Sequence, residues 1–177
     1  MLLSVQQKYI LETLRKLGCV KQDQIHALVR GKFQRPDFEI SEARMTTMLR
    51  QLRFGLGDFH VEGNFVYLAR DQPDTAHLEA IDIMLELSEN APQNFTTKVE
   101  SPCLLRFGLG GDKLKLFSVA QLSHISDPQL IQLERSERIV WISDSSTPPE
   151  GLTLPPKHFF AAQQADGSHR FYGSNGP

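Results

Sequence analysis

Apolar residues recur at three- and four-residue intervals in two stretches of the first third of the chain. One stretch runs from Ser4 to Leu17 and is followed by Gly18, a residue that commonly ends a helix. The other runs from Ser41, a favourable N-cap, to about Phe54, with Gly55 as the expected stop. Both patterns predict amphipathic helices. The predicted buried stripe of the second helix is Met45, Met48, Leu49 and Leu52.

A shorter helical pattern lies between these two helices. It covers Lys21 to Arg30, with apolar residues on one stripe, and Gly31 stands where a helix is expected to stop. The segment from Lys32 to Glu39 contains a proline and predicts a loop. We expect its two aromatic residues, Phe33 and Phe38, to pack against the core.

An alternating pattern follows from Phe59 to Ala69, interrupted by Glu62-Gly63-Asn64. Alternation around a Gly-Asn pair is typical of a β-hairpin. The first 70 residues therefore have the predicted order helix, helix, helix, hairpin, which is the order of a winged helix-turn-helix domain.

The remainder of the chain predicts a second, small α/β domain over residues 75–172. A polar, proline-containing hinge at residues 71–74 separates it from the first domain, residues 1–70, and residues 173–177 are expected to be a flexible tail. The fold class is therefore α+β. The expected elements are an acidic helix at 75–88, strands at 104–109 and 113–120, a helix from Asp127 to about Glu137, a strand at 138–143, and a hairpin formed by 158–164 and 169–172.

Composition is that of a globular protein, with 40% hydrophobic and 23% charged residues. No apolar run approaches the ~18 residues of a membrane span, so we expect a cytoplasmic protein with no membrane contact. Cys19 and Cys103 lie far apart, and the histidines show no metal-ligand spacing, so neither a metal nor another cofactor is expected.

Charge is distributed unevenly along the chain. Residues 1–70 hold 11 Lys and Arg against 7 Asp and Glu, whereas the remainder holds 8 against 14. Such an asymmetry suggests that the first part faces nucleic acid and that the second part has another task.

The face of the third helix opposite its buried stripe is the most informative candidate site. Small residues there permit close entry into the major groove of DNA, and Arg and Thr supply base and phosphate contacts. A solvated helix surface is the alternative interpretation. The candidate DNA-binding residues on this helix, in the preceding loop and in the hairpin are Lys32, Arg35, Arg44, Thr46, Thr47, Arg50, Arg53 and His60.

One feature qualifies a DNA-binding interpretation. The tip of the predicted hairpin carries Glu62, which phosphates would repel, so a protein–protein interaction module stays open as an alternative function.

The pentapeptide Arg-Phe-Gly-Leu-Gly occurs twice, at residues 53–57 and 106–110. Neither copy has the strand before it and the helix after it that a phosphate-binding loop requires, so no duplicated phosphate site is predicted.

The second domain has an element order similar to that of restriction-endonuclease-like domains, but its second strand lacks the carboxylate and lysine that hold a catalytic metal. Asp112 and Lys115, near one turn, are better explained as a solvated hairpin tip. A divergent nuclease is therefore the weakest of three hypotheses, and catalytic residues are not expected.

Taken together, the first 70 residues resemble winged helix-turn-helix proteins. The whole chain resembles bacterial replication-relaxation proteins of plasmids and other mobile elements. This resemblance implies a double-stranded DNA partner and a role as an accessory or regulatory factor in replication, transfer or transcription. A replication or transfer protein is the partner expected under the alternative, protein–protein interaction hypothesis, and homodimeric binding stays open.

Overall fold

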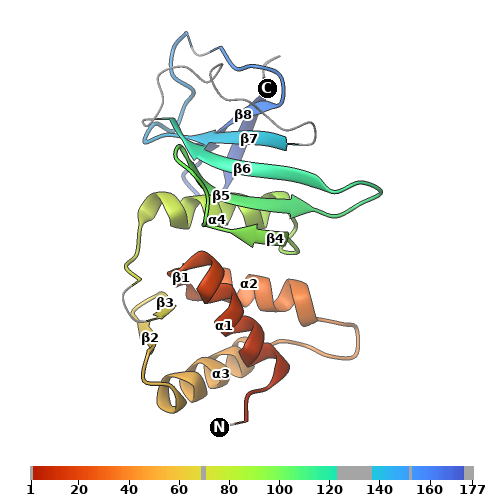
Figure 1. The fold of residues 1–177 in the computed structure, drawn as a ribbon, viewed down its shortest axis with the longest axis vertical. Coiled ribbons are helices and arrows are strands. Elements are labelled where there is room, and N and C mark those ends of the chain that lie inside the picture. Colours follow the sequence, from red (N-terminus) through yellow and green to blue (C-terminus); the bar gives the residue numbers. More distant parts are fainter. Residues whose placement is uncertain (1, 69–70, 123–136, 152, 174–177) are drawn as a thin grey trace.

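The computed structural model describes residues 2–68, 71–122, 137–151 and 153–173. Over these residues the chain is a mixed α+β protein with four helices and two sheets. Figure 1 shows the first half, with its helices and small sheet, at one end of the molecule and the six-stranded sheet at the other. None of the described helices is long and apolar enough to cross a membrane.

The first and third helices begin and end as their apolar periodicity predicts. Helix α1 spans Val5–Leu17, with a capping box at Ser4 and a Gly18 cap in the left-handed region of φ. Helix α3 spans Glu42–Gly55, and the Ser41 hydroxyl accepts a hydrogen bond from the Arg44 amide. The predicted stripe of α3 is confirmed, since its buried residues are Met45, Met48, Leu49 and Leu52.

Helix α2, Gln22–Phe33, runs beyond the stop that we predicted at Gly31. Gly31 is a helix residue at which α2 passes against the turn after the fourth helix. A Cβ atom placed on Gly31 would lie 1.8 Å from the backbone oxygen of Asn90, so only glycine allows this approach. The glycine therefore serves close packing and not helix termination. Phe33 belongs to the helix, and it and Phe38 pack against the core as expected.

The predicted hairpin is confirmed as β2, Phe59–Glu62, and β3, Phe65–Leu68. A two-residue strand that we did not predict, β1 at Val20–Lys21, pairs with β3 on its other side. The small sheet therefore has the order β1-β3-β2 and links the start of α2 to the hairpin.

The second half is a six-stranded sheet with one helix against it. Helix α4 spans Thr75–Leu87, and the strands stand in the order β4-β5-β6-β7-β8-β9. Strands β6, β7 and β8 are parallel to one another, and the remaining pairs are antiparallel. The strands are β4 Gln93–Thr96, β5 Cys103–Leu109, β6 Lys115–Gln121, β7 Glu137–Ile142, β8 His158–Gln163 and β9 His169–Gly173.

These strands confirm most sequence predictions for this half. Strand β4 was not predicted, and the last strand includes Gly173, which we had placed in the tail. The helix expected from Asp127 lies outside the described residues, except for Glu137, which is the first residue of β7. The rest of the expected tail, residues 174–177, also lies outside them.

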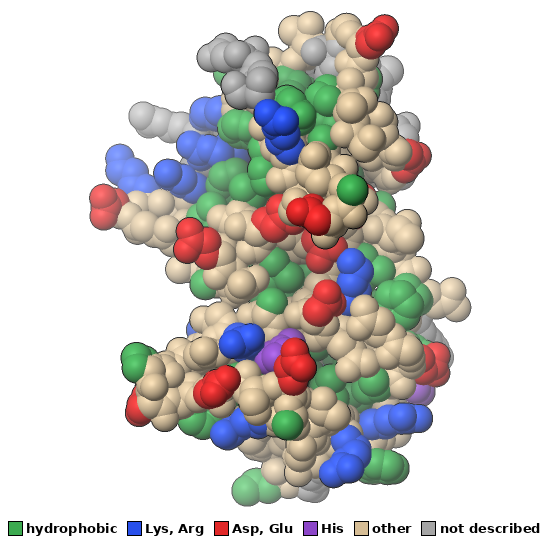
Figure 2. Space-filling model, turned by 180° about the vertical axis from the view of Figure 1, so that it is seen from behind, with side chains coloured by type: hydrophobic (Ala, Val, Ile, Leu, Met, Phe, Trp, Pro, Cys, Tyr) green, Lys and Arg blue, Asp and Glu red, His purple; other side chains and the backbone are tan. Residues whose placement is uncertain are grey.

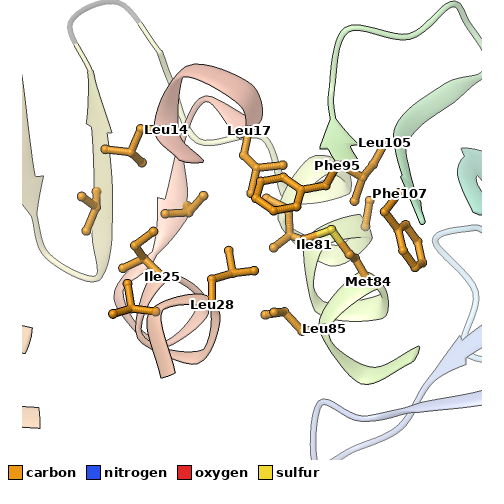
Figure 3. Close-up of a cluster of buried hydrophobic side chains, with 14 of the residues drawn as sticks. Leu14, Leu17, Ile25, Leu28, Ile81, Met84, Leu85, Phe95, Leu105 and Phe107 are labelled. Carbon is orange, nitrogen blue, oxygen red and sulfur yellow. The ribbon is translucent and has the colours of Figure 1, made fainter. Parts of the chain in front are cut away.

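Buried side chains of the two halves form one continuous hydrophobic cluster. In Figure 3, leucine and isoleucine side chains of α1 and α2 face Ile81, Met84 and Leu85 of α4. Phe95 lies beside Leu17, and Leu105 and Phe107 lie on the strand side of α4. Helix α4 thus contributes to the core of the first half as well as to that of the sheet. The division into separate folding units at residues 71–74 stays a prediction.

Polar contacts reinforce this junction at the start of α2. The Lys21 ammonium lies 2.8 Å from Asp82 Oδ2, and Gln24 Nε2 donates to Asp82 Oδ1 and to the Leu78 carbonyl, at 2.7 and 2.8 Å. Gln24 is buried, so these bonds satisfy a side-chain amide that would otherwise be costly to bury. Because Lys21 of β1 and Gln24 of α2 both bind the Asp82 carboxylate of α4, the halves are held in a defined orientation.

Candidate nucleic-acid interface

Helix α3 presents an exposed face on the side opposite its buried stripe. Figure 1 shows the helix at the end of the molecule that lies away from the six-stranded sheet. This face is therefore open to a large ligand. Its exposed residues include five predicted contacts, Arg44, Thr46, Thr47, Arg50 and Arg53, together with Ala43, Gln51 and Phe54.

The loop before α3 positions one of these arginines. Backbone hydrogen bonds in both directions join Arg35 and Phe38 and form a tight turn. The Arg44 guanidinium carbon lies 4.3 Å from the centroid of the Phe38 ring, a cation–π contact. The turn therefore places the exposed Arg35 close to Phe38, the residue whose ring contacts Arg44.

The hydroxyl of Thr47 is directed back onto its own helix. It donates a 2.9 Å hydrogen bond to the Ala43 carbonyl. A threonine in this state has no free proton to donate, so it offers a ligand a methyl group and an acceptor oxygen. The sequence alone suggests a different role, in which the threonine hydroxyl donates a hydrogen bond to a DNA base.

A shallow pocket separates the exposed face of α3 from the beginning of α1. It has a volume of about 470 Å³ and is lined by Gln6 and Gln7 of α1 and by Arg44, Thr47 and Gln51 of α3. Gln7 Nε2 donates to Gln51 Oε1 at 2.9 Å across its floor. This bond fixes the position of α3 relative to α1 and places amide groups beside the arginines.

Arg50 and Arg53 lie further along α3, and both are exposed. Within the described parts of the chain, neither forms a salt bridge. Figure 2 shows Lys and Arg side chains at the lower end of the molecule, over the first half of the chain, and a second group at the upper left, over the second half. Exposed arginines without an acidic partner attract polyanions.

Lys32 does not share this face. It lines a separate pocket with Tyr9, Glu12 and Lys16 of α1 and with Phe95 of β4, at the junction between the halves. The structure therefore does not group Lys32 with the predicted arginines of α3.

The β2–β3 hairpin, residues 59–68, contains no Lys or Arg. His60 is half-buried, and its ring stacks on that of Tyr67 with a centroid separation of 5.2 Å. A hydrogen bond to the Glu62 carboxylate, with help from burial, raises the pKa of Tyr67. The exposed Glu62 thus stays at the tip as an acidic group that interacts with Tyr67.

The sheet face away from α4 holds a buried polar cluster. The Ser118 hydroxyl donates to Glu137 Oε1 at 2.9 Å, and Arg106 Nη2 donates to the same oxygen at 3.1 Å. The single carboxylate there is thus engaged by an arginine. Asp112 and Lys115 are exposed beside the β5–β6 turn, as expected. Among the described residues no group of three or more His, Cys, Asp or Glu could hold a metal ion.

Two histidines of the second half lie in structural roles. His158 is buried and accepts a 2.9 Å hydrogen bond from Trp141 Nε1, and burial lowers its pKa. His169 lies between two glutamates of α4, with Nδ1 2.8 Å from Glu86 Oε1 and Nε2 3.5 Å from Glu79 Oε1. The hydrogen bond of His158 joins β8 to β7, and the contacts of His169 join β9 to α4.

Sequence reasoning missed Phe54 as a member of the candidate interface. It was treated only as the end of α3, yet its side chain is 83% exposed. The spacing of residues along the helix could have predicted this position. Phe54 follows Thr47 by seven residues and therefore lies about 20° from it around the helix, on the same outer face.

Comparison with known proteins does not assign the chain to a family: no family model, no curated protein and no solved structure matches it.

Proposed function

We propose that this is a non-enzymatic DNA-binding protein in which the first half acts as a winged helix-turn-helix domain and α3 enters the major groove. The observation that carries the proposal is the exposed, cationic face of α3, opposite a fully buried stripe of Met45, Met48, Leu49 and Leu52. A packed helix that leaves small residues and unpaired arginines outward is suited to groove entry.

The arginines have different proposed tasks. Arg50, beside Thr47 in the middle of the helix, contacts base edges. Arg44 and Arg53, nearer the two ends of α3, contact phosphates, and Arg35 extends this cationic edge into the loop. His60, stacked on Tyr67, is left with a minor contact at most.

The proposed role of the protein is that of an accessory or regulatory factor in replication, transfer or transcription of a mobile element, rather than that of a nuclease. In the second half, α4 is followed by β4, β5 and β6 and then by β7, an order compatible with a nuclease-like scaffold, but the facing positions of β5 and β6 hold Arg106 and Ser118. A metal-dependent nuclease needs carboxylates there. Catalysis is therefore not part of the proposal.

The test is fluorescence anisotropy with random-sequence duplexes, and with duplexes selected from a library, at roughly 50 and 200 mM salt. Binding by the wild type should weaken steeply with salt, because each phosphate contact releases counterions. The double variant Arg44→Ala/Arg50→Ala should bind at least ten times more weakly. If the wild type binds no duplex at low salt, the proposal is wrong.

A second candidate function is protein–protein interaction. The acidic hairpin tip at Glu62 favours it, as does a pocket at the junction lined by Asp23, Asp82, Glu86, Glu89 and Asp166. Capture of a replication or transfer protein that persists in high salt, combined with no duplex binding at low salt, would favour this function over DNA binding.

A further inference from the structure

Phe54 is an exception among the aromatic residues of this chain. Its side chain is 83% exposed, whereas every other phenylalanine is buried or half-buried. Phe33 and Phe38, which flank the loop before α3, both pack against the core. Exposing a large apolar ring to water does not stabilise the fold, and this ring shares the outer face of α3 with the proposed DNA contacts, so a ligand is the better explanation for its position.

The ring belongs to a line of apolar groups along the outer face of α3. Ala43, Thr47 and Phe54 are separated by four and seven residues, which places them on one side of the helix over about three turns. The Thr47 hydroxyl is bonded to the Ala43 carbonyl, so these three residues present methyl groups and a ring rather than donors. Arg50 follows Ala43 by seven residues and therefore stands in the same line, between Thr47 and Phe54.

Thymine is the base whose major-groove edge matches such a line. Its C5-methyl group projects into the major groove, and Ala, the Thr methyl group and Phe are the side chains that commonly contact it. Cytosine, adenine and guanine carry no methyl group at this edge and are distinguished there by their hydrogen-bonding atoms.

A second copy of this chain is a poorer occupant of the same surface. Symmetric packing about Phe54 would bring Arg50 and Arg53 of both copies together. Neither arginine has an acidic partner in the described structure, so like charges would meet without compensation.

We infer that the line Ala43–Thr47–Phe54 contacts thymine methyl groups, with Phe54 as a specificity-determining residue, so that the preferred duplex site contains thymine. The inference rests on the proposed function, because it requires α3 to enter the major groove.

The test compares two chemically matched duplexes. A duplex selected for binding is synthesised with thymidine and again with deoxyuridine at every thymidine position, which removes only the methyl groups. We expect the wild type to bind the deoxyuridine duplex roughly fourfold more weakly for each contacted methyl group. Phe54→Ala should lose the part of this discrimination that the ring supplies, so the ratio of its affinities for the two duplexes should be smaller than that of the wild type.

Two control variants accompany the test. Phe54→Leu keeps an apolar side chain and should retain most of the discrimination. Leu114→Ala removes an exposed apolar residue from the second half and should leave the ratio of the two affinities unchanged.

The outcomes separate the inference from the proposed function. If no duplex binds, the proposed function fails and the inference fails with it. If duplexes bind but thymidine and deoxyuridine are equivalent for the wild type, only the inference is overturned. It is also overturned if Phe54→Ala converts a dimer into a monomer in sedimentation while leaving the affinity ratio unchanged.

Discussion

The guanidinium of Arg44 lies over the ring of Phe38, 4.3 Å from its centroid. Phe38 is half-buried and packs against the core, so its exposed ring face forms a fixed support for a long side chain that projects from the first turn of α3. An arginine held in this way loses less conformational freedom when it binds a phosphate.

This contact predicts that Phe38→Leu weakens DNA binding although Leu preserves the apolar packing. A cation–π contact at an exposed site contributes about 0.5–1 kcal/mol, so the dissociation constant should rise about two- to fivefold. Anisotropy titrations of Phe38→Leu, Arg44→Ala and the double variant measure it. If Phe38→Leu costs as much affinity without Arg44 as with it, the ring acts through the loop and not through the arginine.

Arg50 and Arg53 should differ in what their removal changes. Arg50→Ala is expected to relax sequence preference and to cost about 1–3 kcal/mol on the selected site. Arg53→Ala should weaken all duplexes to a similar degree and reduce the slope of log affinity against log salt by about one. Titrations on selected and scrambled duplexes at several salt concentrations separate the two. Equal effects of both variants on both duplexes would contradict the assignment of Arg50 to base contacts.

The close approach of α2 to the turn after α4 predicts that Gly31→Ala destabilises the protein. Alanine favours helix over glycine by about 1 kcal/mol, but its Cβ would lie 1.8 Å from the Asn90 oxygen, and backbone must move to accommodate it. We expect a net loss of about 1–3 kcal/mol in the free energy of unfolding, measured by urea denaturation.

Gly57→Ala is the matched control for this substitution. A Cβ on Gly57 would meet no atom within 4 Å, and its φ is not in the left-handed region. Its free energy of unfolding should change little, or rise by about 0.4–1 kcal/mol. Similar destabilisation at both glycines would indicate that the contact with Asn90 is not the cause.

The position of His169 predicts a pH-dependent contribution to stability. Burial by itself would lower the pKa of His169, but Glu79 and Glu86 outweigh it and raise the pKa above its ordinary value. The contribution should therefore be complete below about pH 6.5, the ordinary histidine pKa, and be lost as the pH rises through the higher pKa of the folded state.

The measurement is the difference in unfolding free energy between the wild type and His169→Gln, from urea denaturation at pH 5.5 to 9. At the acidic end the difference should be about 1.5–3 kcal/mol, the range for hydrogen bonds to charged groups, and it should shrink as pH rises. His158, whose pKa is lowered, has the opposite dependence and cancels in this difference. A difference that grows with pH would contradict the assignment.

Local patterns in the sequence were sufficient to predict the helices and hairpins. Periods of 3.6 and 2 residues, with Ser41 as a predicted cap, depend only on neighbouring residues, and α1, α3 and the two predicted hairpins of the second half agree with them. The outward positions of Arg44, Thr47 and Arg50 follow from the same helical geometry, so most of the candidate interface could also be predicted.

Only the tertiary structure decided how those elements use each residue. Strand β1 has only two residues, and β4 reads Gln-Asn-Phe-Thr, with a single apolar residue, so neither leaves a periodic signal; both exist because β3 and β5 pair with them. Gly31 is a packing residue because Asn90, far along the chain, lies against it. Lys32 lies at the junction rather than at the interface for a similar reason.

The sequence by itself therefore determined the α+β composition and the face of α3 that is left outward. The three-dimensional packing decided that α1, α2 and α4 share one core, that the Thr47 proton is bound to Ala43, and that Phe54 alone among the phenylalanines stays in water. Hydrophobic periodicity records which side of an element is buried, but it does not record which partner covers that side.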